Sequence, residues 1–362
     1  MRHIARNNCI INKIKDGLAT VQFNRPEKLN AVNLEMCEDI LESAKLWNEH
    51  AVVTILQGNG KTFSVGADFQ HLLNISQRTN DQSNVSTNDQ LKDISKISQL
   101  GDQTKKALYT MNQTKSIMVS IMNGSAIGIG AGFGINSRFK IATENSTFVM
   151  PQCKIGMVPD GGSALHFSKL QQNYGLYLGM SGEQIDGIKM VHLGIADFLI
   201  DSQCLPEIEE EFEHAYFLRD EESIEEFLLQ RFCQRHRTEF NIPKQFENVL
   251  GLSSLPSIMS AMEAQFPQQA AEIRKNSAFS VYAFYEQYMR NKKTKLSLKD
   301  NLKMEQSILD KVVVRPDLIE GLKSQYVDTS YAPKFNPKTI EEVNQEEIQR
   351  CFEPCSRKLF DD

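Results

Sequence analysis

The chain has 362 residues, of which 41% are hydrophobic and 24% charged, and its formal net charge is -6. A chain of this size and composition can bury a sizeable core, as one large domain or two smaller ones. The acidic balance gives no nucleic-acid footprint, and no apolar run approaches the length that spans a membrane. The acidic excess is concentrated in residues 207–226, which indicates a solvated helical face.

The first predicted elements are a β-hairpin and a helix. Alternating apolar residues at 9–14 and 18–23 flank the pair Asp16-Gly17, and Asp-Gly between two such runs is a strong hairpin signal. Asn33 is suited to cap a helix over residues 34–50, where apolar side chains recur at helical spacing.

Strands and helices alternate through the middle of the chain. A β-branched run at 51–58 predicts a buried strand, and residues 117–124 and 139–151 predict further strands. Residues 75–90 are rich in Ser, Asn, Gln, Thr and Asp, which predicts a flexible polar insert. Helical spacing returns over residues 91–113.

Helices dominate the remainder. One helix is expected to begin near Gly162 and to run to Tyr174, and the pattern is mostly helical from about Pro206 onward. The β-β-α rhythm before that point recurs at irregular spacing, which favours an α/β spiral over a strict repeat array. We therefore expect a spiral core over residues 8–205 and a mostly helical portion over residues 206–362.

Two glycine-rich turns follow predicted strands. Gly66 and Ala67 come after the strand at 51–58, and residues 128–130 come after the strand at 117–124. Glycine in such a turn lets backbone N–H groups approach a ligand closely. Two amides from separate turns that point at one carbonyl oxygen form an oxyanion hole, which polarises a thioester. For either turn alone, tight packing between layers is the favoured explanation. The occurrence of both, followed by the segment 150–162, favours the oxyanion hole.

The segment MPQCKIGMVPDGG, residues 150–162, holds the candidate proton-transfer groups. Thioester hydrolysis needs a group that takes a proton from water, or a carboxylate that attacks directly. Asp160 can act as a base, and the start of the following helix would favour its ionised form. Gln152 cannot act as a base, but its amide can hold a water molecule. If the segment is extended, the neighbouring Cys153 points to the opposite face.

Together these features resemble the crotonase (enoyl-CoA hydratase/isomerase) superfamily and, within it, the 3-hydroxyisobutyryl-CoA hydrolase branch. The resemblance runs nearly from end to end, and it implies an α/β fold, a crotonase-type ββα spiral followed by helices. The matching segments are NRPEKLNAVN (24–33), FSVGADF (63–69), NGSAIGIGAG (123–132), the segment 150–162, GIKMVHLGIADFLIDS (187–202) and VVRPDLIEGLKSQYVDTSYAPKFNP (313–337).

The resemblance also assigns roles to particular residues. It implies that the backbone amides of Ala67 and Ile129 hold the thioester oxygen. The residues that it implies for CoA binding are Lys28, Leu29, Ala31, Gly66 and Asp68. The chain departs from the family at two positions. Where the family usually has three consecutive glycines, the matching donor position is Ile129 and not a glycine, and Gln152 stands where the hydrolase branch has a catalytic glutamate. The partner acid is present as Asp160.

We therefore expect an acyl-CoA thioester hydrolase similar to the enzyme of valine breakdown, with Asp160 as base or acid and Gln152 orienting water. The loss of a general base typically lowers a rate by about 10² to 10⁴, so the activity is expected to be weak. An alternative is a catalytically silent relative that serves as a structural subunit of the mitochondrial ribosome small subunit. Hydratase or isomerase chemistry is a weaker alternative, because Gly132 stands where the hydratase needs a second glutamate.

Partners and compartment follow from the same resemblance. CoA is part of the substrate, so neither a separate cofactor nor a metal is expected. The partner is an acyl-CoA molecule, and a homo-oligomer or the ribosomal small subunit stays open. The seven cysteines form no C-x-x-C pair, which favours free thiols in a reducing compartment. The resemblance implies a mitochondrial location, although the basic segment 1–7 is shorter than a usual presequence.

Overall fold

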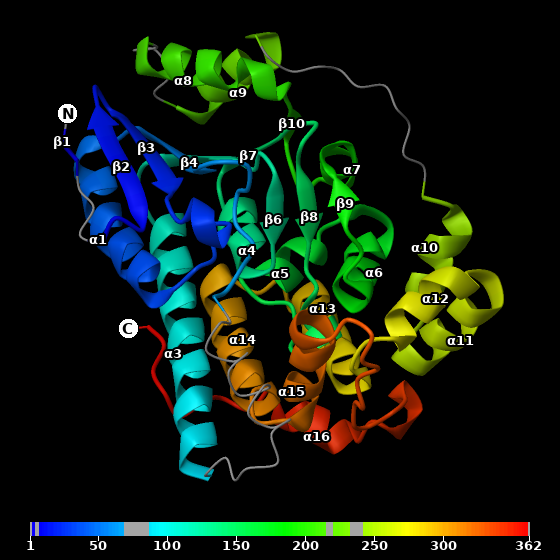
Figure 1. The fold of residues 1–362 in the computed structure, drawn as a ribbon. Helices are drawn as coiled ribbons and strands as arrows, with labels where there is room; N and C mark the ends of the chain where they lie inside the picture. The colour runs from blue at the N-terminus through cyan, green and yellow to red at the C-terminus, as the bar shows by residue number, and fades with distance from the viewer. Residues whose placement is uncertain (1, 4–6, 69–86, 215–219, 232–241, 361–362) are drawn as a thin grey trace. The chain divides into compact units, whose positions relative to one another are not determined.

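The computed structural model describes residues 2–3, 7–68, 87–214, 220–231 and 242–360 (Figure 1). Its contacts divide the chain into two compact units, and each unit is assembled from stretches that are separate in the sequence. Unit 1 comprises Met1–Ala67, Gln103–Val149 and Gln184–Phe240, and unit 2 comprises Asp68–Asp102, Met150–Glu183 and Asn241–Asp362.

All the described β-strands belong to unit 1. They are β1 (Arg2–His3), β2 (Ile10–Lys15), β3 (Leu18–Phe23), β4 (Val53–Gly58), β5 (Ile117–Ile121), β6 (Ser125–Ile127), β7 (Phe139–Ala142), β8 (Thr147–Val149), β9 (Ile185–Asp186) and β10 (Phe198–Leu199). The larger sheet has the order β1-β2-β3-β4-β5-β7-β10, and the smaller sheet has the order β6-β8-β9. In the larger sheet the pairs among β1, β2 and β3 are antiparallel, and all later pairs are parallel.

Helices cover these sheets within unit 1. They are the 3₁₀-helices η1 (Pro26–Lys28) and η4 (Ser202–Cys204), the α-helices α1 (Leu34–His50), α4 (Ile129–Ile135), α7 (Gly187–Leu193), α8 (Leu205–His214) and α9 (Glu221–Arg231), and the C-terminal part of α3 (Thr87–Asn112). None of the helices in the described ranges has the length and apolar character needed to cross a membrane.

The predicted hairpin and first helix are confirmed. Strands β2 and β3 pair in antiparallel register across Asp16 and Gly17, whose φ angles are +50° and +89°. Two positive φ angles are what a tight hairpin turn of this kind requires. Helix α1 begins at Leu34, and the Asn33 side chain caps it by accepting a hydrogen bond from Met36 N at 2.9 Å.

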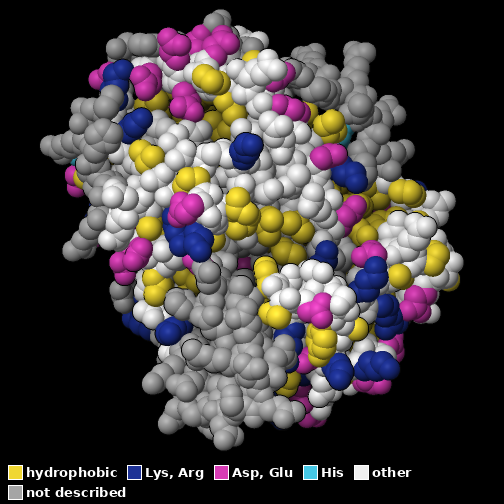
Figure 2. All heavy atoms as spheres, viewed as in Figure 1, with side chains coloured by type: hydrophobic (Ala, Val, Ile, Leu, Met, Phe, Trp, Pro, Cys, Tyr) yellow, Lys and Arg dark blue, Asp and Glu magenta, His cyan; other side chains and the backbone are white. Residues whose placement is uncertain are grey.

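The core of unit 1 lies on its parallel strands. Ile55, Val119 and Ile141 from neighbouring strands are fully or almost fully buried, and they share a cluster with Ile208 of α8 and Leu228 of α9. The other face of these two helices is acidic. Figure 2 shows Asp and Glu side chains gathered over α8 and α9, so the expected solvated acidic face is confirmed.

Among the described residues of unit 2, the regular elements are all helices, joined by turns and irregular segments. Besides the N-terminal part of α3 it contains η2 (Gln152–Ile155), α5 (Ser163–Phe167), η3 (Gln171–Asn173), α6 (Tyr174–Ser181), α10 (Lys244–Leu250), α11 (Leu255–Gln265), α12 (Pro267–Arg274), α13 (Ala278–Thr294), α14 (Leu298–Val312), α15 (Pro316–Leu322), the π-helical turn η5 (Lys323–Val327), η6 (Ile340–Glu342) and α16 (Gln345–Arg350). Helix α13 packs against α5, α6 and α14.

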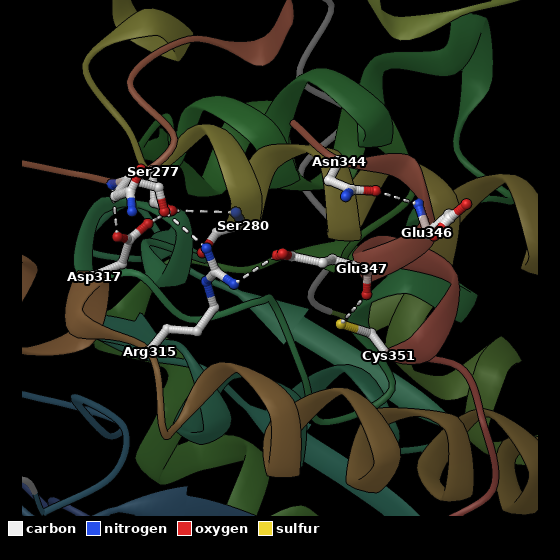
Figure 3. Close-up of polar contacts among 9 residues, drawn as sticks. Ser277, Ser280, Arg315, Asp317, Asn344, Glu346, Glu347 and Cys351 are labelled. Atoms are coloured by element: carbon white, nitrogen blue, oxygen red, sulfur yellow. Dashed lines mark hydrogen bonds and ion pairs between the residues drawn. The ribbon is translucent and has the colours of Figure 1, made fainter. Parts of the chain in front are cut away.

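A polar cluster, of which Ser277 and Asp317 are buried, ties α15 and α16 to the start of α13 (Figure 3). Ser277 Oγ donates to Asp317 Oδ2 at 2.5 Å. The Arg315 guanidinium lies 3.6 Å from the centre of the Phe279 ring and pairs with Glu347 at 3.2 Å. Because buried polar groups are costly unless they are hydrogen-bonded, these contacts define where the chain after α14 must pack.

The single helix predicted from Gly162 to Tyr174 is wrong. The structure has two helices, α5 and α6, separated by a corner in which Gln172 and Asn173 have φ angles of +56° and +57°. A right-handed helix cannot continue through such residues. The corner is tight, because a Cβ atom on Gly175 would lie 2.2 Å from the Phe167 carbonyl oxygen.

Two other predictions concern segment boundaries. Residues 75–86 of the polar insert lie outside the described residues, and residues 87–90 form the first turn of α3, so the start predicted at residue 91 is one turn late. The predicted division into residues 8–205 and 206–362 stays a prediction. Helix α8, which begins at Leu205, and helix α9 pack on the sheet of unit 1.

Candidate functional site

The first glycine turn lies at the edge of the strands in unit 1. Ser64 bridges Ala126 of β6, and Ala67 bridges Val32, both in parallel register. The second bridge is held by a hydrogen bond from Val32 N to Gly66 O at 2.7 Å. This bond uses the Gly66 carbonyl and leaves the Ala67 N–H out of the pairing. Gly66 itself has a φ angle of +93°, which an L side chain rarely adopts.

The second glycine turn joins β6 to α4. Gly128 has a φ angle of +52° and precedes Ile129, the first residue of the helix. The first N–H groups of a helix have no acceptor within it, so the Ile129 amide needs an outside partner. The Ile129 side chain is buried, with 4% of its surface exposed.

The two turns are packed directly against each other. A Cβ atom on Gly66 would lie 2.9 Å from the Ile127 carbonyl oxygen and 3.7 Å from Ile129 N. A Cβ atom on Gly130 would lie 2.4 Å from Ser64 Oγ. Glycine is therefore required at both positions because the layers pack tightly there, which is the explanation favoured above for either turn alone. The same packing brings the backbones of the two predicted amide donors together, which an oxyanion hole also requires.

The predicted CoA-binding loop lies next to the first turn. Leu29 has a left-handed backbone conformation and is 54% exposed, whereas Ala31 is buried. Val65 N donates to Leu29 O at 3.2 Å, which ties the loop to the glycine turn. Asn30 is fully buried, and its amide donates to Thr62 O at 2.7 Å. The loop therefore has a defined shape, and it keeps Lys28 at the surface.

The acid segment belongs to unit 2. Gln152 begins the 3₁₀-helix η2 and is 6% exposed, so the extended conformation considered for this segment is wrong. Gln152 Nε2 donates to Asp160 Oδ1 at 3.1 Å. A carboxylate oxygen can only accept, which agrees with this orientation of the amide. Among the described residues, the buried Gln152 Oε1 has no hydrogen-bond partner.

Asp160 lies on a turn that leads into α5. Its backbone oxygen accepts from Ser163 N at 3.2 Å, and Gly161 and Gly162 between them have φ angles of +66° and +80°. Asp160 is partly exposed. The arrangement keeps a carboxylate accessible at a defined distance from a neutral amide, so it can take up or return a proton at Asp160.

Cys153 does not share this chemistry. Its side chain is fully buried. Burial raises the pKa of the Cys153 thiol far above its ordinary value, and the nearby Lys154 ammonium offsets this only slightly. The reactive thiolate is therefore disfavoured.

The structure distributes the predicted residues between the two units. Unit 1 holds Lys28, Leu29, Ala31, Gly66, Ala67 and Ile129, and unit 2 holds Asp68, Gln152 and Asp160. Their functional roles stay predictions. One residue that the sequence reasoning missed is Glu305 of α14, whose Oε1 accepts from Gly162 N at 2.9 Å. The sequence does contain an indication of its burial, because Glu305 shares a helical face with the apolar residues Leu302, Ile308 and Leu309.

Comparisons with known proteins agree with this architecture. The computed structure superimposes on the crystal structure of a carnitinyl-CoA dehydratase from Mycobacterium thermoresistibile with a TM-score of 0.82, over 98% of this chain and 99% of that one. The sequence identity of the pair is 19%, so the likeness establishes the fold. The predicted crotonase-type fold is confirmed.

The sequence comparisons reach nearly the whole chain. A mitochondrial 3-hydroxyisobutyryl-CoA hydrolase from Dictyostelium discoideum is 27% identical over 353 residues, which cover 93% of this chain and 89% of the relative. A small ribosomal subunit protein from Arabidopsis thaliana is 26% identical and covers 92% of this chain and 82% of its own length.

A sequence model described as enoyl-CoA hydratase/isomerase matches residues 18–352. This range includes both glycine turns of unit 1 and the acid segment and α14 of unit 2. Taken with the fold, it shows that the chain belongs to the enoyl-CoA hydratase/isomerase family.

Proposed function

We propose that this protein is an acyl-CoA thioester hydrolase that acts on 3-hydroxyisobutyryl-CoA or a close analogue, in the mitochondrion. The observation that carries the proposal is the packing of the two glycine turns in unit 1, where the Cβ position of Gly66 lies 3.7 Å from Ile129 N. In the proposal, the amides of Ala67 and Ile129 hold the thioester oxygen as it gains negative charge. Such donors typically contribute a factor of about 10² to 10³ each.

Asp160 supplies the proton transfer in this proposal. Its carboxylate takes a proton from water while the water oxygen attacks the thioester carbon. The resulting oxyanion is held by the two amides. When the oxyanion collapses, the carbon–sulfur bond breaks, and the protonated Asp160 returns its proton to the leaving CoA sulfur.

Gln152 has a supporting part. Its Nε2 already donates to Asp160 Oδ1, so it orients the carboxylate and leaves Oε1 to accept from a water molecule. Because an amide cannot exchange the proton that a glutamate would exchange, we propose a slow hydrolase. CoA enters as part of the substrate, with the loop of Lys28, Leu29 and Ala31 as its binding segment, along with Gly66 and Asp68.

The test is CoA release from 3-hydroxyisobutyryl-CoA by the wild-type protein and by Gln152→Glu. A glutamate at this position would face Asp160 across about the same distance as the present amide. Two carboxyl groups so close share a proton, so one serves as acid while the other serves as base. We expect a gain in rate of about 10². Gln171→Glu, which changes an exposed glutamine of the same unit, is the matched control and should give no gain.

The outcome that contradicts the hydrolase proposal is the absence of CoA release from both proteins at high enzyme concentration. The buried Ile129 side chain would then be the first feature to examine, since it stands where the family has glycine. Ile129→Gly would show whether its bulk closes the acyl pocket.

A second candidate is a non-catalytic subunit of the mitochondrial ribosome small subunit. The neutral Gln152 at the acid position favours it, as does the ribosomal relative from Arabidopsis thaliana. Sedimentation of the tagged protein with the small ribosomal subunit would support this candidate. Migration as a free monomer or small oligomer would remove it.

A further inference from the structure

A second carboxylate is buried beside the acid turn of unit 2. Glu305 lies on α14, which packs against α5 (Figure 1), and 3% of its surface is exposed. Its Oε1 accepts from Gly162 N at 2.9 Å and from Asn301 Nδ2 at 2.8 Å. Gln287 Nε2 lies 3.5 Å from the same oxygen. The two shorter contacts come from N–H groups, which supply Oε1 with the donors that a buried acceptor needs.

The contact with Gly162 spans 143 residues of sequence, and it adds a tertiary hydrogen bond to a turn whose own bond runs from Ser163 N to Asp160 O. Gly161 and Gly162 both have left-handed backbone angles, and glycine reaches such angles without settling in one of them. A buried backbone N–H is costly to leave without an acceptor, so the bond from Gly162 N to Glu305 favours the turn in which it forms. Glu305 therefore selects one conformation of the turn that carries Asp160.

Asp160 and Glu305 also border the same small cavity. Its volume is about 10 Å³, and Gln287 lines it together with apolar side chains of α14 and of the acid turn. This volume has room for about one water molecule. The Gln287 side chain is fully buried, and its Oε1 has no hydrogen-bond partner within the described part of the chain. Gln287 of α13 and Glu305 of α14 thus line this cavity together with Asp160.

We propose that Glu305 is a positioning residue for Asp160. By holding the Gly162 N–H it fixes the Asp160–Gly162 turn, and it thereby sets where the proton-accepting carboxylate lies. The expected effect of Glu305 on the rate of CoA release rests on the hydrolase function proposed above. Its expected effect on the conformation of the Asp160–Gly162 turn does not depend on that function.

The conformational test is hydrogen exchange measured by mass spectrometry on Glu305→Ala, Glu305→Gln and Gln306→Ala. Gln306 is the matched control, because it neighbours Glu305 on α14, is 2% exposed, and instead donates to Asp102 Oδ1 at 3.1 Å. We expect the amides of residues 157–166 to exchange about tenfold faster in Glu305→Ala than in the wild type. Glu305→Gln keeps an acceptor oxygen and should lie between the two. Gln306→Ala should leave residues 157–166 as in the wild type.

The kinetic arm uses CoA release by whichever background is active, wild type or Gln152→Glu. Glu305→Ala should lower kcat about tenfold with little change in KM, since a displaced base slows the chemical step more than binding. Glu305→Gln should recover part of the loss. Unchanged exchange at residues 157–166 in a folded Glu305→Ala protein overturns the proposal, and so does an equal effect of Gln306→Ala. If neither background releases CoA, the hydrolase function fails, and the exchange arm alone upholds or overturns the positioning role.

Discussion

The two units prepare their predicted functional groups by different means. Unit 1 presents backbone amides on turns that are shaped by glycine, at Gly66 and at Gly128 to Gly130. Unit 2 presents side chains, with Gln152 and Asp160 in contact and Glu305 bound to the turn that carries Asp160. The described strands are all in unit 1, whereas the described regular elements of unit 2 are all helices.

This difference shows where the family chemistry is sensitive to substitution. Every residue except proline carries a backbone N–H, so Ile129 in place of a family glycine keeps the donor. A side-chain acid is lost in a single substitution, as Gln152 illustrates. When a member of this family loses activity, we therefore expect the side-chain acids to be substituted while the backbone amide donors remain.

The largest expected effect is on the rate of CoA release, when the side-chain acid of unit 2 is removed. Asp160→Asn removes the carboxylate that takes the proton but keeps its size and its place beside Gln152. We expect CoA release to fall by about 10² to 10⁴. Asp328→Asn, at an exposed carboxylate of the same unit that accepts from Ser330, should leave the rate unchanged. Equal rates for Asp160→Asn and the wild type would show that unit 2 contributes no base.

The next largest effect is expected on the stability of the fold, when a glycine turn of unit 1 is changed. Gly66→Ala would combine a φ angle of +93° with a Cβ atom 2.9 Å from the Ile127 carbonyl oxygen. We expect the free energy of unfolding to fall by about 2–4 kcal/mol. Gly194→Ala isolates the backbone term, because Gly194 has a φ angle of +81° and no atom within 4 Å of the added Cβ. It should cost about 1 kcal/mol. Urea unfolding of both variants measures the difference, and equal losses would mean that the two turns can move apart.

A smaller effect is expected on stability at alkaline pH, where the ionisation of tyrosines affects unit 2. The described tyrosines with raised pKa values all lie in unit 2, and burial raises the pKa of Tyr288 to about 12. A raised pKa means that the folded state holds its proton more tightly than the unfolded state. Its contribution is thus complete below pH 10 and is lost as the pH rises toward 12.

Tyr288→Phe should therefore reduce the loss of stability between pH 9 and pH 11 by about 1 kcal/mol. Urea unfolding at these two pH values measures the change in unit 2 when hydrogen exchange in α13 is used to detect unfolding. The fluorescence of Trp47, the single tryptophan, reports on unit 1. A slope with pH that is the same in Tyr288→Phe and the wild type would contradict this prediction.

The smallest effect is expected for a surface ion pair of unit 2. The Arg274 guanidinium donates to both oxygens of Glu341, and this pairing lowers the pKa of Glu341 to about 2. A lowered pKa stabilises the fold above the ordinary value, near pH 4.5, and the contribution is lost as the pH falls toward 2. Because half of the Glu341 side chain is exposed, Glu341→Gln should cost less than about 1 kcal/mol at pH 7.

Urea unfolding at pH 7 and at pH 3 checks this prediction for Glu341. The difference between Glu341→Gln and the wild type should shrink at the lower pH. Glu353→Gln, at another exposed glutamate of unit 2, serves as the control for a change in net charge. A loss larger than that expected for Gly66→Ala would reverse the ranking of buried and exposed features.

Local structure followed from the sequence wherever a few neighbouring residues decide the conformation. Asp16-Gly17 specified a hairpin turn, and Asn33 specified the start of α1. The helix predicted from Gly162 to Tyr174 failed because Gln172 and Asn173 have left-handed backbone angles and Gly175 lies against the Phe167 carbonyl, features that helical periodicity does not record.

The sequence by itself determined the family, the α/β fold and the residue types available for thioester chemistry, because these depend on motifs and local propensity. Tertiary structure alone decided which of those residues meet. The Gly66 turn contacts the Ile129 turn, the Gln152 amide faces Asp160, and Glu305 reaches Gly162 from a helix 143 residues away. Such contacts arise from the packing of helices and strands that are remote in the chain, and the burial of a polar group becomes apparent only when its partners are in place.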